Sequence, residues 1–208
     1  MILSDQKSNN DVFPEKDVYC TWLFQGNCVV YPTETVYGLG ADIYNENAVR
    51  NIFMIKQRPF TQPLSVAVTC LDEISEFVHI TELAKTLASS FLPGPLTLIL
   101  KKKTNRLSIV AGNSSTIGIR IPDHPIAKQL LSEFGPLTST SANLHQMPIP
   151  STITEIAQQL SKHSKLIQYI DAGPCSGLPS TIVDCSQEPV KILREGLISK
   201  QHIWDAIY

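Results

Sequence analysis

Short apolar runs alternate along the chain with longer stretches in which apolar residues recur every three or four positions. The short runs have the length and composition of β-strands, and the longer stretches have the spacing of amphipathic helices. The predicted strands lie at residues 28–32, 64–69, 96–101, 116–121, 137–141, 165–170, 180–185 and 190–193. This interleaving of strands and helices predicts an α/β layer fold.

Polar residues ahead of the apolar stripes predict where the helices begin. Asn45 precedes ENAVRNIFMIKQ, and Thr152 with Glu155 forms a capping-box pattern ahead of IAQQL. The other predicted helix starts are at Thr81, Asp123 and Ser199. Because no repeat or low-complexity linker separates these segments, we expect one domain over residues 17–208, after a flexible segment over residues 1–16.

Composition narrows the class of protein. The 208 residues are 43% hydrophobic and 17% charged, as in soluble globular proteins. The sequence predicts neither a membrane span nor a signal peptide, since it has no run of about 20 apolar residues and no apolar stretch after a basic start. The five cysteines form no CxxC pair, which favours free thiols. We therefore expect a cytoplasmic protein, and the net charge of −2 limits any RNA contact to a local patch.

Several well-known site motifs do not occur in the sequence. Gly38 and Gly40 form half of a dinucleotide fingerprint, but Ile43 replaces the third glycine and no GK[ST] is present. The five histidines form no HExxH motif, so we predict no metal site. GPCSGLPS does not have the spacing of a nucleophile elbow. We expect Gly38 and Gly40 to serve in a turn and in close packing beneath a site.

Hydroxyl side chains gather at the ends of the predicted strands. Thr35 follows the first strand, and Ser180 begins another. In PLTSTSAN, an extended backbone would direct Ser139 and Ser141 to one side and the neighbouring threonines to the other. Serine and threonine also cap and turn for local reasons. Three such sites in one α/β chain nevertheless indicate a ligand, because ligands of open sheets bind beyond strand ends.

Positive charges lie at the ends of predicted elements. Lys56 and Arg58 end a helix just before Pro59, Arg120 lies in the apolar segment IGIRIP, and Arg194 follows VKIL. An arginine flanked by strand apolars is often paired with an anion. Guanidinium and ammonium groups without a matching carboxylate cluster suit phosphate, which arginine binds as a fork and lysine as a point charge.

These features together resemble the YrdC/TsaC family, the threonylcarbamoyl-AMP synthases. The matching blocks follow family order from about residue 17 to the end. They are YPTETVYGLG, IKQRP, PGPLTLIL, IGIRIPDHP, TSTSAN and LPSTIVD followed by ILREG. The resemblance implies a single-domain YrdC-like fold, with a twisted mixed β-sheet and flanking helices around a concave ligand cleft. Within the family, the chain resembles the short bacterial form, which lacks a further C-terminal domain.

The family makes threonylcarbamoyl-adenylate and pyrophosphate from L-threonine, bicarbonate and ATP, for the N6-threonylcarbamoyladenosine modification of tRNA. The resemblance implies that the residues contacting threonine are Thr35, Arg120, Ser139 and Ser180. It implies that the residues contacting ATP are Lys56, Arg58, Gln62, Thr116, Ser141, Asn143 and Arg194, with Lys56 and Arg58 as the catalytic pair. The chain departs from common family residues at Gln62, Ala67, His145, Gln146 and Ile149.

The resemblance further implies Mg²⁺ carried by the triphosphate through waters, without a protein cage. It implies hand-off of the adenylate to a TsaD-type transferase, with at most a weak contact to tRNA. The basic cluster Lys101–Lys103 with Arg106 is the main support for an alternative, a non-catalytic RNA-binding or ribosome-maturation module. A carbamoyl-transfer domain like that of hydrogenase-maturation proteins is a third interpretation. We expect Glu34 either to orient a basic neighbour such as Lys56 or to face solvent.

Overall fold

The computed structural model of the chain describes residues 16–208. The predicted flexible segment lies outside the described residues except for Lys16, which begins the first helix. The helices are α1 (Lys16–Phe24), α2 (Glu46–Lys56), α3 (Glu82–Phe91), α4 (Pro125–Phe134), α5 (Ile153–Gln159) and α6 (Lys200–Asp205), with 3₁₀ turns at Leu71–Ile74 and Ser161–Leu166. The strands are β1 (Cys28–Tyr31), β2 (Gly38–Gly40), β3 (Ser65–Ala67), β4 (Val78–His79), β5 (Leu96–Lys102), β6 (Thr116–Arg120), β7 (Leu137–Ser141), β8 (Ile167–Tyr169), β9 (Thr181–Asp184) and β10 (Lys191–Arg194).

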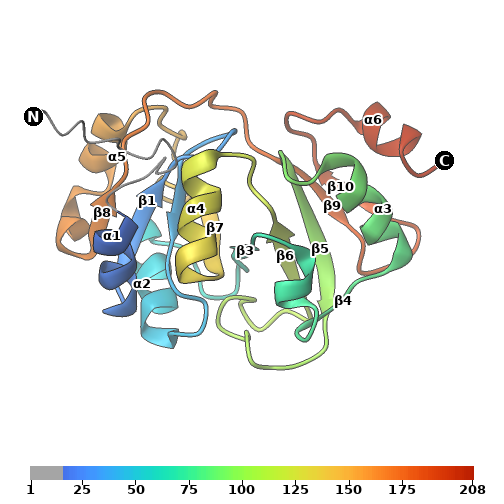
Figure 1. Cartoon of the computed structure of the whole chain (residues 1–208), viewed down its shortest axis with the longest axis horizontal. Helices are drawn as coiled ribbons and strands as arrows, with labels where there is room; N and C mark the ends of the chain where they lie inside the picture. Colours follow the sequence, from blue (N-terminus) through green and yellow to red (C-terminus); the bar gives the residue numbers. More distant parts are fainter. Residues whose placement is uncertain (1–15) are drawn as a thin grey trace, which may run out of the picture.

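The strands form one mixed sheet, as predicted. Its order is β10-β9-β5-β6-β3-β7-β2-β1-β8, and β4 pairs with β5 at the side of this path. The pairs β1–β8, β3–β6 and β5–β9 are parallel, and the other pairs are antiparallel. Figure 1 shows α1, α2, α4 and α5 gathered at one end of the sheet, with α3 and α6 at the other.

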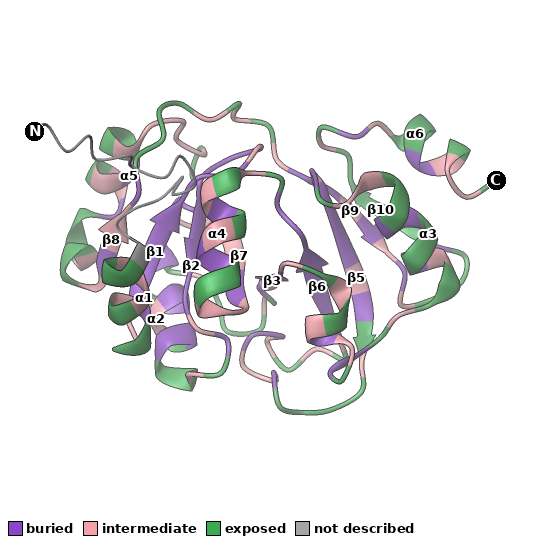
Figure 2. Ribbon diagram, viewed as in Figure 1, coloured by how far each residue is buried: buried purple, intermediate pink, exposed green. Residues whose placement is uncertain are grey.

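Strand β1 shows how both faces of the sheet are covered. Val29 and Tyr31 pack in a cluster with residues of α1 and α4, whereas Cys28 and Val30 pack in the larger cluster that includes α2 and α3. All four side chains are fully buried. Alternate residues of a strand point to opposite faces, so each face of β1 faces a hydrophobic core. Figure 2 shows β1 buried beside helices whose outer surfaces are exposed.

The eight strands predicted from sequence all form, with ends that differ by no more than two residues. Short strand β2 is a correction, because Gly38 and Gly40 lie in a strand between β1 and β7 rather than in a turn. Their predicted close packing is confirmed. A Cβ atom would lie 2.8 Å from the Tyr31 ring at Gly38 and 2.9 Å from it at Gly40. The tyrosine ring therefore occupies the space that side chains would need.

Four of the five predicted helix starts are confirmed. The side chains of Asn45, Thr81, Thr152 and Ser199 each accept a hydrogen bond from a backbone N–H in the first turn. The fifth is wrong by one residue: His124 precedes α4, and the Asp123 carboxylate instead pairs with Lys128 Nζ at 2.5 Å. Within the described residues, no helix is long and apolar enough to cross a membrane.

Candidate active site

A cavity of about 300 Å³ opens where strand ends from both halves of the sheet meet. Six of the predicted site residues line its wall: Arg58, Arg120, Ser139, Ser141, Ser180 and Arg194. Among the described residues that line the cavity, none is an aspartate or a glutamate. The wall therefore combines three guanidinium groups with hydroxyls and presents no carboxylate to the cavity, which is the composition expected for a site that binds anions.

The other predicted site residues lie outside this wall. They are Thr35, Lys56, Gln62, Thr116 and Asn143. Four hydroxyl residues that sequence reasoning did not select do line the cavity: Thr33, Ser65, Thr97 and Thr140. Thr33 and Thr97 belong to the blocks YPTETVYGLG and PGPLTLIL, so their position beside a strand end was the available signal. Thr140 was expected on the side opposite the serines, but it lines the cavity with them.

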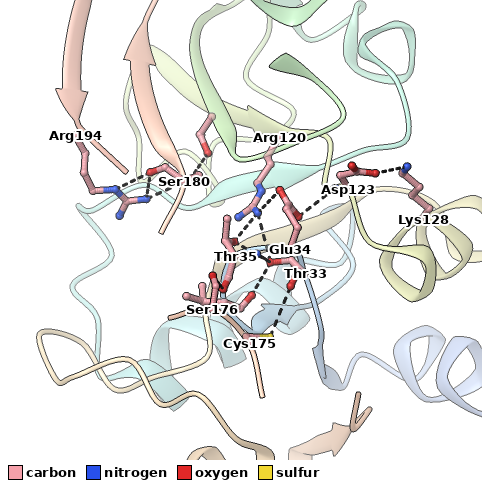
Figure 3. Close-up of polar contacts among 12 residues, drawn as sticks. Thr33, Glu34, Thr35, Arg120, Asp123, Lys128, Cys175, Ser176, Ser180 and Arg194 are labelled. Atoms are coloured by element: carbon pink, nitrogen blue, oxygen red, sulfur yellow. Dashed lines mark hydrogen bonds and ion pairs between the residues drawn. The ribbon is translucent and has the colours of Figure 1, made fainter. Parts of the chain in front are cut away.

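Arg120 lies at the end of β6 and is held by the segment that follows β1 (Figure 3). Its Nη2 donates to Glu34 Oε1 at 2.8 Å and to Thr35 Oγ1 at 2.6 Å, with a longer contact of 3.4 Å to Thr33 Oγ1. Glu34 thus pairs with a basic neighbour, as one of the two expectations had it, but that neighbour is Arg120 rather than Lys56. Thr35 is fully buried behind the guanidinium.

The loop that precedes β9 braces this segment from the other side. Ser176 Oγ and the Gly177 N–H donate to the Thr35 carbonyl, at 2.7 and 3.3 Å. The Cys175 thiol contacts the Thr33 carbonyl at 3.7 Å (Figure 3). The backbone beside Arg120 is therefore fixed by contacts between residues about 140 positions apart in the sequence.

The other two guanidinium groups are anchored by backbone carbonyls. Arg58 donates from Nε to Gln62 O at 3.1 Å and from Nη2 to Pro63 O at 2.9 Å. Arg194 donates from Nε and Nη2 to Ser180 O, at 3.0 and 2.9 Å. A guanidinium has five N–H donors, so each side chain keeps donors for a ligand.

The arginines also influence one another electrostatically. Burial lowers the pKa of Arg58. Burial, and then the charge of Arg120, lowers the pKa of Arg194. Like charges that disfavour one another across a cavity are relieved by a bound anion, so the electrostatics agree with the composition of the wall.

Lys56 ends α2 with its ammonium buried beside the cavity wall, and the residue is only 2% exposed. Its Nζ donates to Ser141 O, to Asn143 O at 2.7 Å and to Asn143 Oδ1 at 3.1 Å. Burial, and then the charge of Arg58, lowers the Lys56 pKa to about 7. The three oxygen acceptors oppose this shift, because they favour the charged form. In this structure Lys56 holds the Ser141–Asn143 segment rather than lining the cavity.

The remaining predicted ATP contacts have local partners. The backbone carbonyl of Gln62 accepts from Arg58, and the Thr116 hydroxyl lies 3.0 Å from Ser114 Oγ. Asn143 Nδ2 donates to Met147 O at 2.7 Å, and Ser141 Oγ donates to Asn143 Oδ1 at 2.6 Å. The contacts of Asn143 hold the loop that follows β7, next to the cavity.

A pair of contacting hydroxyls also lines the cavity. Thr97 Oγ1 and Ser180 Oγ are 2.9 Å apart, and both residues are buried. Arg194 Nη2 also approaches Ser180 Oγ, at 3.3 Å. Within residues 16–208, no group of three or more histidine, cysteine, aspartate or glutamate side chains is placed to hold a metal ion. The site can thus bind and orient anions through arginines and hydroxyls.

Comparison with known proteins places this fold and site in context. The Sua5/YciO/YrdC family profile, described as "Telomere recombination", matches residues 21–196. A Methanocaldococcus jannaschii protein provisionally named a threonylcarbamoyl-AMP synthase is 42% identical over 182 residues, which are 87% of this chain and 85% of that protein. The Bacillus subtilis threonylcarbamoyl-AMP synthase is 38% identical over 97% of this chain and 58% of its own length.

A solved structure of a related protein has a similar fold. The crystal structure of Pyrococcus abyssi Sua5 complexed with L-threonine superposes with a TM-score of 0.87 at 34% identity, over 93% of this chain and 57% of that one. The chain thus spans less than two thirds of the Bacillus and Pyrococcus proteins and most of the Methanocaldococcus protein. From the match over residues 21–196 and these relatives, the chain belongs to the Sua5/YciO/YrdC family.

Proposed function

We propose that this protein is a threonylcarbamoyl-AMP synthase. The observation that carries the proposal is the cavity wall, in which Arg58, Arg120 and Arg194 surround one space that has no carboxylate among its described lining residues. The reaction brings together the carboxylate of L-threonine, bicarbonate and the triphosphate of ATP, all of them anions. The relatives that carry this name support the same activity.

The chemistry requires little acid–base catalysis from the protein. Bicarbonate and the neutral amine of threonine give a carbamate and water. A carbamate oxygen then forms a bond to the α-phosphorus of ATP, and the bond between the α-phosphorus and the bridging oxygen breaks, so pyrophosphate leaves. The protein must position two anions and stabilise charge on phosphate oxygens, which are tasks for fixed cations and backbone donors.

We assign the triphosphate to Arg58 and Arg194, and threonine to Arg120, Ser139 and Ser180. Arg58 and Arg194 have their backbone anchors on different elements, so together they can hold an extended anion. Thr35 supports the threonine subsite from behind Arg120. In this proposal Lys56 acts through the Ser141–Asn143 segment, whose carbonyls it holds.

Magnesium enters this proposal only with the nucleotide. The described cavity wall offers no carboxylate to ligate it, so protein side chains would not hold the ion, and it would be carried by the triphosphate and water. We further propose that the product passes to a TsaD-type transferase in the cytoplasm. The exposed Lys101 and Lys103 at the end of β5 would supply no more than a weak, salt-sensitive contact to tRNA.

The test measures pyrophosphate release by purified protein with ATP, Mg²⁺, L-threonine and bicarbonate. Release should require both threonine and bicarbonate, and mass spectrometry should detect threonylcarbamoyl-adenylate. Arg58→Ala should lower the rate by at least about a hundredfold, in the range found for groups that stabilise transition-state charge. Arg50→Ala, which removes an exposed arginine of the same helix region, is the matched control. Pyrophosphate release that continues at the same rate without threonine would refute the proposal.

A further inference from the structure

Glu34 carries a largely buried carboxylate that has no role in the proposed reaction. We propose that Glu34 is a positioning residue, which holds the Arg120 guanidinium in the orientation that receives the carboxylate of the amino-acid substrate. This inference rests on the proposed function, and it adds a residue to the recognition of threonine. It is carried by the contacts of the two side chains and by one unused donor of Arg120.

Arg120 is fixed mainly by its ion pair with Glu34. Its side chain is 8% exposed and that of Glu34 is 18% exposed, so their 2.8 Å ion pair is largely shielded from water. Nη2 of Arg120 has two hydrogens, and its two short contacts are to Glu34 and Thr35. That nitrogen is fully used within the protein and has nothing left for a ligand.

Arg120 also keeps donors that no described residue uses. Its Nε is buried and has no hydrogen-bond partner among the described residues. The residue itself is only 6% exposed and lines the cavity. A buried guanidinium donor without a partner is costly unless a ligand meets it. Nη1 of Arg120 also makes no hydrogen bond to a described residue, so the contacts to Nη2 leave this nitrogen for an incoming carboxylate.

The other carboxylate oxygen of Glu34 contacts a different segment of the chain. Oε2 accepts a hydrogen bond of 3.1 Å from the Asp123 N–H, in the link between β6 and α4. The same carboxylate thus joins the segment after β1, the end of β6 and the approach to α4 (Figure 3). A shorter carboxylate could not make both contacts from the same backbone position.

Geometry and charge make opposite predictions for the loss of Glu34. If the negative charge mattered most, its removal would strengthen the attraction between Arg120 and a substrate carboxylate. Removing one partner of a buried pair, however, leaves an uncompensated charge, which the long arginine side chain relieves by moving toward water. Because Glu34 provides one of two short contacts to Nη2, we expect orientation to dominate and binding to weaken.

The experiment compares Glu34→Ala, Glu34→Gln and Glu34→Asp in the pyrophosphate assay, with calorimetric binding of L-threonine to each protein. Glu34→Ala should raise the KM and the dissociation constant for threonine at least about tenfold, with the KM for ATP changed less than threefold. Glu34→Gln should give values between those of wild type and Glu34→Ala, because its amide oxygen still accepts from Arg120 but carries no charge. Glu34→Asp keeps the charge and tests the reach of the side chain even if Glu34→Ala fails to fold.

The matched control is Glu82→Ala, which removes a glutamate from an exposed ion pair with Lys85 on α3. It should leave both KM values as in wild type. Threonine affinity that is unchanged or increased in Glu34→Ala and Glu34→Asp would overturn the inference, as would equal rises in the KM for threonine and for ATP. If wild type released no threonine-dependent pyrophosphate, the proposed function would fail. An active wild type with unaffected Glu34 variants would overturn the positioning role alone.

Discussion

Replacing Lys56 by methionine should make the stability of the protein depend differently on pH. Methionine has a similar length and no charge, so the change removes the buried ammonium and keeps most of the packing. The ordinary lysine pKa is 10.5 and that of Lys56 is about 7. The positive charge of this buried side chain, which also lies near Arg58, therefore costs about 5 kcal/mol, at about 1.4 kcal/mol for each pH unit.

The substitution also removes hydrogen bonds. The carbonyls of Ser141 and Asn143 would lose their donor, at about 1–3 kcal/mol for each buried acceptor left unpaired. Asn143 Oδ1 would keep the Ser141 hydroxyl as its donor. At pH 6 the removed desolvation cost and the lost hydrogen bonds are of similar size, so Lys56→Met should differ from wild type by no more than about 2 kcal/mol.

The sign of the pH effect follows from proton binding. Between pH 7 and 10.5 the unfolded chain holds a proton on Lys56 that the folded chain has released. Stability rises with pH wherever the unfolded state binds more protons, so the wild type gains stability over this range. Lys56→Met lacks this gain. The difference in unfolding free energy should move in favour of wild type by about 2 kcal/mol between pH 7 and pH 9.

Urea unfolding followed by circular dichroism at pH 6, 7, 8 and 9, at constant ionic strength, measures this difference. Other titrating groups are common to both proteins and cancel in it. Lys85→Met, which removes an exposed lysine, shows whether the loss of a positive charge alone alters the slope. A difference between wild type and Lys56→Met that stays constant from pH 6 to pH 9 would refute the reasoning.

Three further predictions concern the walls of the cavity. Thr97→Val should raise the KM for threonine and lower the free energy of unfolding by about 1 kcal/mol, because Ser180 loses its 2.9 Å hydroxyl partner. Thr97→Ser keeps the hydroxyl and should restore both values, as measured by steady-state kinetics and thermal unfolding. Arg194→Lys should lower kcat/KM at least about tenfold, since lysine keeps the charge but lacks the pair of N–H donors that holds Ser180 O. A kcat/KM equal to that of wild type would contradict this. Gly196→Ala should cost about 1–3 kcal/mol by urea unfolding, because the added Cβ would lie 2.1 Å from Pro179 O.

The parts of the fold that depend on local pattern could be predicted from sequence. The strand containing CVVYP and the helix capped by Asn45 form where their apolar spacing and capping residue indicate. Strand β2 could not be predicted in this way. Its glycines have no side chains to produce an alternating pattern, and it forms because β1 and β7 pair with it on both sides.

The residues of the candidate site could likewise be predicted from sequence only in part. The sequence identified the arginines and serines at strand ends, and the fold brings Arg58, Arg120 and Arg194 to one cavity. It could not identify the partner of Glu34, because Arg120 lies 86 positions away and is brought close only by the pairing of the sheet. Nor could it foresee that the Lys56 ammonium would be occupied by carbonyls of a segment 85 to 87 positions away.

The gathering of three arginines around one cavity has a consequence for the direction of the reaction. Groups that stabilise the transition state of adenylate formation stabilise the same state when it is approached from pyrophosphate and the adenylate. Pyrophosphate is itself a polyanion suited to Arg58 and Arg194, so it should compete with ATP as it accumulates. A cell that uses this protein must therefore keep pyrophosphate low or remove the adenylate quickly, because the same cavity otherwise returns its product to threonine, bicarbonate and ATP.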